Sequence, residues 1–229
     1  MNRIASVMTM YSRDRFSWFL LPWIIVGSSF AINVFIALLL GGKTPIYTGG
    51  LSSIYVFMMV VGAITVAGTF PFAVGFGVRR KDYFLGTIAM AVATSAAWAI
   101  LIWLLSLIEG NLIPNWGVDL HFFHLPYVSD GPLYAQLWTF FAVMVLMYFL
   151  GFLPASVYQR FGRTGMYTLF GLSGLLLSVL SLVNTYWNWW GPILDWFGQQ
   201  SAAMLGLWTV PVIAVCILAS YALLRKATI

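Results

Sequence analysis

The residues that could do chemistry in this chain gather in one short basic and aromatic stretch. Residues 75–86 read Gly-Phe-Gly-Val-Arg-Arg-Lys-Asp-Tyr-Phe-Leu-Gly and lie between two long apolar runs. The three adjacent cations at 79–81 are too costly to bury in hydrocarbon, so this stretch must lie in water. Tyr83 and Phe84 add an apolar surface beside the charges. These residue types favour either a helix that docks on a soluble partner or a charged turn that anchors two membrane spans.

Candidate catalytic groups are few. The stretch Gly-Leu-Ser-Gly at 171–174 resembles the serine motif of rhomboid intramembrane proteases. Ser173 would need a histidine base on another span to take its proton. Both histidines of the chain, His121 and His124, instead fall in one loop. We therefore interpret Ser173 as a packing residue and expect that the chain is not an enzyme.

The sequence favours neither a metal site nor a nucleotide site. His121 and His124, with Asp119 and Asp130, offer the right ligand types for a metal ion, but a three-residue spacing in an aromatic loop is weak evidence. Solvated loop histidines are the preferred interpretation. The chain has no Gly-x4-Gly-Lys-Ser/Thr segment that could cradle phosphates. We expect no metal and no cofactor in this chain.

Composition identifies the solvent that surrounds most of the chain. Of 229 residues, 62% are hydrophobic and 7% are charged, whereas a soluble domain carries about 25% charged residues. An integral membrane protein is therefore expected. The net charge of +5 does not indicate nucleic-acid binding, because the cations lie in small groups at the ends of apolar runs.

Six apolar runs are each near the ~20 residues that cross the hydrocarbon core. They predict an all-α membrane protein with a single transmembrane domain, 1–229. Residues 1–15 precede the runs, with apolar residues at helical spacing, and predict an amphipathic helix in the membrane interface; a frayed tail is the alternative. The predicted spans are 16–40, 52–76, 83–108, 134–158, 164–184 and 202–224.

The distribution of cations predicts the orientation. Lys43 is the single cation expected on one side of the membrane. Because short cytoplasmic loops collect Lys and Arg, both chain ends should be cytoplasmic. The cations on the cytoplasmic side are Arg3, Arg13, Arg15, Arg79, Arg80, Lys81, Arg160, Arg163, Arg225 and Lys226.

Small residues in the third run predict close helix packing, since small faces let helices approach in a membrane. Ala91, Ser95 and Ala99 follow four-residue steps, as does a second set at 89, 93 and 97. This run is therefore expected at the centre of the bundle. Gly171 and Gly174 could pack the fifth run in the same way.

None of the 11 basic and 6 acidic residues lies within the six runs. Carriers that are coupled to protons or ions place charged groups there. Any uphill transport would therefore draw its energy from another subunit, and an uncharged interior favours an amphiphilic or apolar cargo. Asn33 lies in the middle of the first run, where it either bonds a neighbouring helix, the favoured interpretation, or faces a substrate path.

The two segments expected on the outer side differ from tight turns. Residues 112–131 contain two prolines and an Asp-Gly pair, which predicts a structured loop. Residues 184–200 are crowded with aromatic side chains that favour the headgroup level. They predict one or two short helices that dip into the interface, broken at Gly191–Pro192; an ordinary aromatic belt is the alternative. The tryptophans are Trp187, Trp189, Trp190 and Trp196.

The whole layout resembles the permease subunits of ABC transporters of the small six-helix exporter type. The matching features are the N-terminal segment 2–15, the basic-aromatic stretch and the aromatic segment before the last run. The resemblance implies a permease dimer, of two copies or of this chain with a homologue, in a bacterial plasma membrane. It also implies a separate ATPase subunit that binds ATP and Mg²⁺. The stretch would be the coupling helix that docks on this subunit: Val78, Arg79, Arg80, Lys81, Asp82, Tyr83 and Phe84.

A rival hypothesis is a binding or scaffold protein that works without ATP. It would sequester a peptide at the outer aromatic segment or assemble other membrane subunits. It predicts no ATPase partner and no role for the 78–84 stretch.

Overall fold

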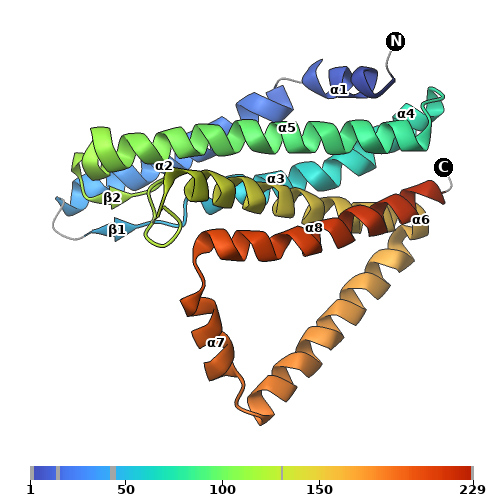
Figure 1. Ribbon diagram of the computed structural model, residues 1–229. Coiled ribbons are helices and arrows are strands. Elements are labelled where there is room, and N and C mark those ends of the chain that lie inside the picture. Colours follow the sequence, from blue (N-terminus) through green and yellow to red (C-terminus); the bar gives the residue numbers. More distant parts are fainter. Residues whose placement is uncertain (1–2, 14–15, 42–44, 130, 228–229) are drawn as a thin grey trace.

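The computed structural model describes residues 3–13, 16–41, 45–129 and 131–227 as a bundle of long helices (Figure 1). Five of the described helices are long and apolar enough to cross a membrane, which confirms the prediction of an all-helical protein. Arg15, Lys43 and Asp130 lie outside the described residues. The long helices are α2 Leu21–Leu40, α3 Ser52–Ile64 with its continuation to Gly75, α5 Arg80–Leu107, α6 Leu133–Tyr186 and α8 Ala202–Arg225.

Shorter elements complete the chain. The helix α1 Arg3–Arg13 lies near the N-terminus, α4 Phe70–Gly75 precedes the basic stretch, and α7 Trp190–Gln199 lies between α6 and α8. The strands β1 Ile46–Tyr47 and β2 Leu120–His121 form a two-stranded parallel ladder. The remaining elements are the π-helical turns η1 Phe16–Leu20, η2 Thr65–Thr69 and η3 Ile108–Leu112 and the 3₁₀ turn η4 Pro114–Gly117.

The fourth and fifth predicted runs belong to one 54-residue helix, α6. Its backbone leaves the helical region at Gly162, where φ is 65° and ψ is −153°. Such a conformation is open to glycine because it has no Cβ. The helix turns sharply near this point, and its second half runs away from the bundle (Figure 1). Six predicted runs thus correspond to five long helices, one of which contains a break.

The first half of α6 is the centre of the bundle, since α6 packs against α3, α5 and α8. The third run, now α5, packs against α6 and α1, and its small residues Ala91, Ser95 and Ala99 are buried. The contact between α3 and α6 is also close because of a glycine. A side chain at Gly62 would overlap the backbone carbonyl of Tyr148, and α3 and α6 can therefore approach until their backbones touch.

The N-terminal helix α1 packs on α5. Val7 and Tyr11 are buried, while Ser6 and Thr9 are exposed. This arrangement follows the predicted apolar stripe for the side chains that are described. Tyr11 reaches the first two turns of α5 and the turn η2, where it joins the cluster of hydroxyl groups described below.

The turn η2 precedes Pro71, which lies in the first turn of α4. Proline has no N–H for the preceding helical turn, and its ring crowds the carbonyl four residues back. The helix accommodates this by widening into a π turn at Thr65–Thr69.

Candidate functional site: the basic end and its hydroxyl cluster

The 78–84 stretch is a turn followed by the first turn of α5. Gly77 has a φ of 78°, and the N–H groups of Gly77 and Val78 donate to the carbonyls of Val74 and Ala73. These bonds close the end of α4. Arg79 is extended and α5 begins at Arg80. The stretch is therefore joined rigidly to the 28-residue α5 and does not form a separate helix.

Tyr83 and Phe84 face the interior, in contrast to the surface role expected for them. Their exposed fractions are 0% and 4%. The ring of Phe84 lies 5.1 Å from that of Tyr221 in α8 and 6.1 Å from that of Phe152 in α6. Tyr83 and Phe84 lie four and three residues before the buried Thr87, so each shares the inner face of α5 with it. A partner could contact the outward residues Val78, Arg79, Lys81 and Asp82 without displacing the buried side chains of Tyr83 and Phe84.

Arg80 ties two helix ends together. Its Nη1 donates a 2.7 Å hydrogen bond to the backbone carbonyl of Arg225. That carbonyl lies at the C-terminal end of α8, where the last helical carbonyls have no partners within the helix. A cation is also favourable there because of the helix dipole. Arg80 therefore links the start of α5 to the end of α8.

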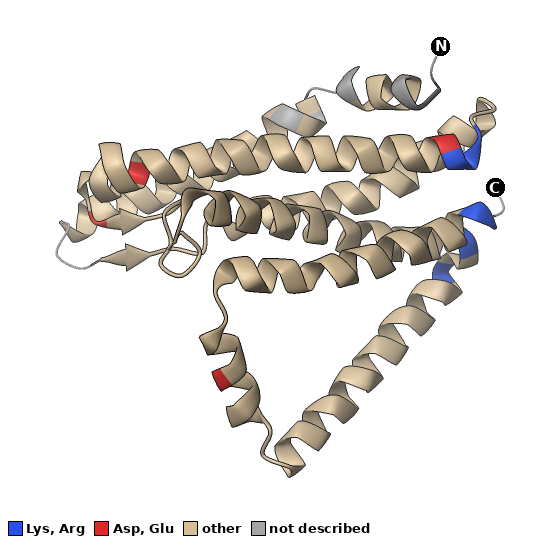
Figure 2. Ribbon diagram, viewed as in Figure 1, with Lys and Arg blue, Asp and Glu red and all other residues tan. Residues whose placement is uncertain are grey.

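The described lysines and arginines of residues 79–226 gather at one end of the bundle, which we call the basic end (Figure 2). They come from three parts of the chain that are distant in sequence: the start of α5, the middle of α6 and the end of α8. Arg79, Lys81 and Arg163 are among the exposed ones. The opposite end of the bundle, which we call the far end, contains Glu109 in η3, directly after α5, and Asp119, directly before β2, whereas Asp82 follows the cations in sequence. The basic end contains Arg79, Arg80, Lys81, Arg160, Arg163, Arg225 and Lys226.

A cluster of hydroxyl groups lies just inside the basic end. The hydroxyl of Tyr11 lies 2.9 Å from Thr69 Oγ1, 3.0 Å from Thr87 Oγ1 and 3.3 Å from Tyr83 Oη. Thr69 Oγ1 lies 2.8 Å from Tyr83 Oη and donates to the carbonyl of Thr65. We call Tyr11, Thr69, Tyr83 and Thr87 the hydroxyl cluster. It joins α1, η2 and α5 through side chains.

The far end is organised by a buried carboxylate. Glu109 is 0% exposed and lies in η3. Its Oε1 accepts a hydrogen bond from the N–H of Phe122, and its Oε2 accepts bonds from Phe123 N–H and Trp116 Nε1, over 2.7 to 2.9 Å. These bonds hold the 112–129 segment as the structured loop that the sequence predicted.

The candidate metal ligands do not converge in the described part of the chain, where no group of three or more His, Cys, Asp or Glu side chains could hold an ion. His121 Nε2 lies 3.9 Å from Asp119 Oδ1, and its ring stacks on Tyr47 at 4.6 Å. His124 Nδ1 lies 3.3 Å from Ser106 Oγ. The two histidines thus contact different partners, and Asp130 is outside the described residues.

Asn33 bonds within its own helix. Its Nδ2 donates to the carbonyl of Ser29 at 2.8 Å, and the residue is half-buried. Because this bond satisfies the amide within α2, the geometry requires neither a bond to a neighbouring helix nor a substrate path beside Asn33. Ser173 likewise donates to the carbonyl of Phe170 and is exposed, as are Gly171 and Gly174, so this face packs against nothing in the described chain.

The aromatic segment forms one short helix, α7, and the turn before it. Gly191 and Pro192 lie in the first turn of α7, so the helix starts there and is not broken there. Trp187 and Trp189 stack at 4.9 Å, and Trp196 contacts Trp208 of α8 at 5.9 Å. The tryptophans are all exposed: Trp187, Trp189, Trp190 and Trp196.

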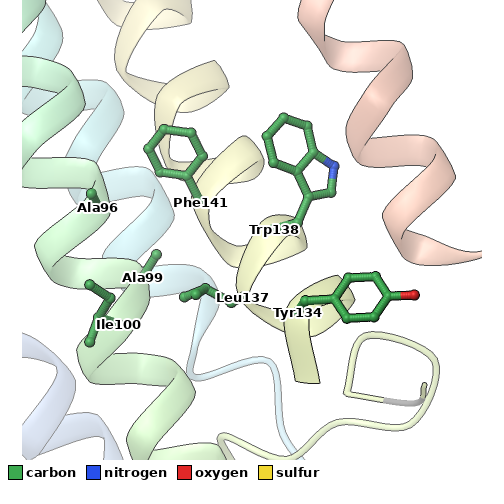
Figure 3. A pocket seen from close by; sticks show the side chains of 7 residues that line it. All are labelled: Ala96, Ala99, Ile100, Tyr134, Leu137, Trp138 and Phe141. Carbon is green, nitrogen blue, oxygen red and sulfur yellow. The ribbon is translucent and has the colours of Figure 1, made fainter. Parts of the chain in front are cut away.

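An apolar cavity of about 340 Å³ lies between α5 and α6 toward the far end (Figure 3). Ala96 and Ala99 leave room on one wall, and Trp138 and Phe141 form the other. These two alanines are three residues apart on α5, and their small side chains leave this space open. The cavity can accept hydrocarbon and offers almost no polar group.

The sequence interpretation missed the hydroxyl cluster and Glu109. Thr65 and Thr69 are four residues apart, as are Tyr83 and Thr87, so each pair lies on one helix face. This spacing was the available signal for the cluster. Glu109 ends an apolar run, which gave no indication that its carboxylate turns inward.

Comparison of the chain with protein-family models, curated proteins and solved structures found no match.

Proposed function

We propose that this chain is the membrane permease subunit of an ABC transporter that exports an amphiphilic or hydrophobic substrate. The proposal includes a dimeric permease, a separate ATPase subunit and a cytoplasmic basic end. In this arrangement the two halves of α6 cross the membrane separately, which gives six spans. The plasma membrane of a bacterium is the proposed location.

The observation that carries the proposal is the exposed start of α5 at the basic end. Arg79 and Lys81 are exposed beside the half-buried Asp82 and Val78. Because the turn is continuous with α5, a force on these residues acts on the whole helix. Arg80 and Phe84 extend the connection to α8. An ATPase bound here would move two spans at once, whereas a loose charged turn would move none.

The docking contact is therefore assigned to the outward residues Val78, Arg79, Lys81 and Asp82. Charged residues at such an edge steer association and fix its register. Tyr83 and Phe84 act one layer further in. Phe84 transmits the movement of the first turn to α6 and α8, and Tyr83 transmits it to α1 and η2. This division differs from the direct docking role expected for the two aromatics.

The test is purification of the chain from its native membrane in mild detergent, with identification of copurifying proteins. An ATPase should copurify, and the double variant Arg79→Glu/Lys81→Glu should lose it. The matched control is Arg163→Glu/Lys226→Glu, which makes the same charge change with exposed residues of the same end. Retention of the ATPase by the first variant would contradict the docking surface.

A second candidate, the ATP-independent scaffold, is supported by the second half of α6 and by α7. Leu172, Leu182 and Tyr186 are 70%, 71% and 82% exposed. Such a free apolar helix could assemble other membrane subunits by packing, or α7 could hold a peptide. Recovery of another integral membrane protein, with no ATPase, under conditions that preserve known complexes would favour the scaffold.

A further inference from the structure

A cavity of about 280 Å³ lies close to the basic end, between the N-terminal segment and α3. Tyr11 and Trp18 line one side of it. Thr65 and Thr69 of η2 line the other, together with apolar side chains of α3. The π turn η2 forms part of the wall, and a Cβ added at Gly68 would meet nothing within 4 Å, so the space beside this glycine is open.

The polar side of the cavity is the hydroxyl cluster. Tyr11 and Thr69, two of its members, reach the cavity directly. A hydroxyl oxygen has two acceptor lone pairs and one donor. The cluster therefore keeps hydrogen-bonding capacity for an added hydroxyl group. Its members come from three elements, so their positions are fixed by packing and do not depend on a ligand.

Among the described residues, no charged side chain lines this cavity. A charged group placed there would lose its hydration without gaining a counter-ion, which is costly. A neutral polar group can instead replace its bonds to water with bonds to the cluster. The chemistry of the lining thus selects an uncharged head.

The mouth of the cavity lies on the flank of α3. Val60, Ile64 and Gly68 line the cavity and are also exposed. In a membrane this flank faces acyl chains. Tyr83 follows Arg80 by three residues, about 4.5 Å along the helix axis. The hydroxyl cluster therefore lies just below the level of the charged residues, at the depth where the polar and apolar parts of a lipid meet.

We propose that this cavity binds an uncharged single-chain amphiphile with a hydroxyl-bearing head, such as a monoacylglycerol. The head bonds Thr69 and Tyr11, and the chain leaves past Val60 and Ile64 into the membrane. The cavity of about 280 Å³ is many times larger than the space that one water molecule needs, which suits a glycerol head and the start of its chain. The site is argued from the cavity alone and does not depend on the transport function.

The test uses the full chain in lipid nanodiscs and a monoacylglycerol that carries a photoreactive diazirine near its head. Crosslinks in the wild type should map to residues 11–21 and 57–69. Gly68→Leu places a side chain in the open space and should reduce labelling roughly tenfold. The matched control is Gly174→Leu, which also adds leucine where nothing lies within 4 Å, but on α6 and away from the cavity.

A second variant tests the head group. Thr69→Val keeps the shape of the side chain and removes its hydroxyl. The wild type should prefer the monoacylglycerol over the methyl ester of the same acyl chain, and the loss of one hydrogen bond should lower this preference roughly three- to tenfold. A charged fatty acid of equal length should compete poorly with the probe.

Two outcomes would overturn the proposal: labelling that Gly68→Leu leaves unchanged, or a wild type that does not distinguish the two heads. The source of the amphiphile is found by extracting lipids from the purified chain. A hydroxyl-headed lipid that is present in the wild type and absent from Gly68→Leu identifies a resident membrane lipid. Probe binding without a copurified lipid identifies an amphiphile that reaches the site from outside.

Discussion

Glu109 is the fully buried acidic side chain of the described chain, and it is surrounded by donors. Three of them, two backbone N–H groups and the indole of Trp116, converge on its two oxygens. Hydrogen bonds to an ionised acceptor are stronger than neutral ones. Glu109 therefore replaces the repeating backbone bonds that an irregular loop cannot make.

We expect Glu109→Gln to loosen the 112–129 segment. The amide keeps one acceptor oxygen and turns an NH₂ group toward a donor, which leaves at least one buried N–H without a partner at a cost of about 1–3 kcal/mol. Hydrogen exchange of Phe122 and Phe123 should then speed up by roughly tenfold or more. Asp195→Asn, an equivalent change at an exposed residue of α7, should leave their exchange as it is. Unchanged exchange in Glu109→Gln would mean that the loop is held by its aromatic contacts alone.

Side-chain direction is the part of the basic stretch that could not be predicted from its sequence. The cations had to lie in water, and they do lie at one end of the bundle. Tyr83 and Phe84 could face a partner or the core, because both environments are apolar. Their burial depends on Tyr221, Phe152 and Tyr11, which come from distant parts of the chain.

The contact between α3 and α6 depends on two glycines that face each other's helix. A Cβ at Gly62 would overlap the carbonyl of Tyr148, and one at Gly151 would overlap the carbonyl of Met59. Inside a membrane the surrounding lipid is itself apolar, so no hydrophobic effect drives helices together. Close van der Waals packing is therefore the main source of their association. These two positions therefore determine how near the helices come.

Gly151→Ala should destabilise the bundle by about 1–3 kcal/mol, the usual cost of an oversized core residue. The thermal midpoint of the purified chain in detergent should fall. Gly174→Ala is the matched control on the same helix, where a Cβ meets nothing within 4 Å; its midpoint should stay or rise, since alanine favours helix more than glycine does. Equal midpoints for both variants would show that α3 and α6 are held by other contacts.

Helices were predictable from apolar length, whereas their contacts were not. Each predicted run lies in a helix, because backbone groups in hydrocarbon must bond within their own segment. The sequence contains several sets of small residues, and only some meet a partner. Gly171 and Gly174 are exposed, while Gly62 and Gly151 form the contact. Which set packs depends on the break at Gly162, a property of backbone conformation that glycine permits but does not impose.

At the scale of the molecule, charge separates the two ends of the bundle. Cations from the start of α5, the middle of α6 and the end of α8 meet at the basic end (Figure 2), while Glu109 and Asp119 belong to elements of the far end. Because membrane insertion retains basic loops in the cytoplasm, this polarity supports the proposed orientation. The proposed orientation also requires that the second half of α6 crosses the membrane, from Arg163 on the cytoplasmic side to the aromatic segment on the outer side.

Cysteine labelling tests this path. The single native cysteine, Cys216, is replaced by serine, and one cysteine is introduced at Arg163 or at Asp195, both exposed. In intact cells a membrane-impermeant maleimide should label Asp195→Cys and reach Arg163→Cys only after permeabilisation. The Cys216→Ser chain alone should take up no label. If both positions react on the same side, the second half of α6 does not cross the membrane, and the chain has five spans with its two ends on opposite sides. The start of α5 and the end of α8 would then lie on opposite sides of the membrane, which would contradict the basic end and the docking surface proposed on it.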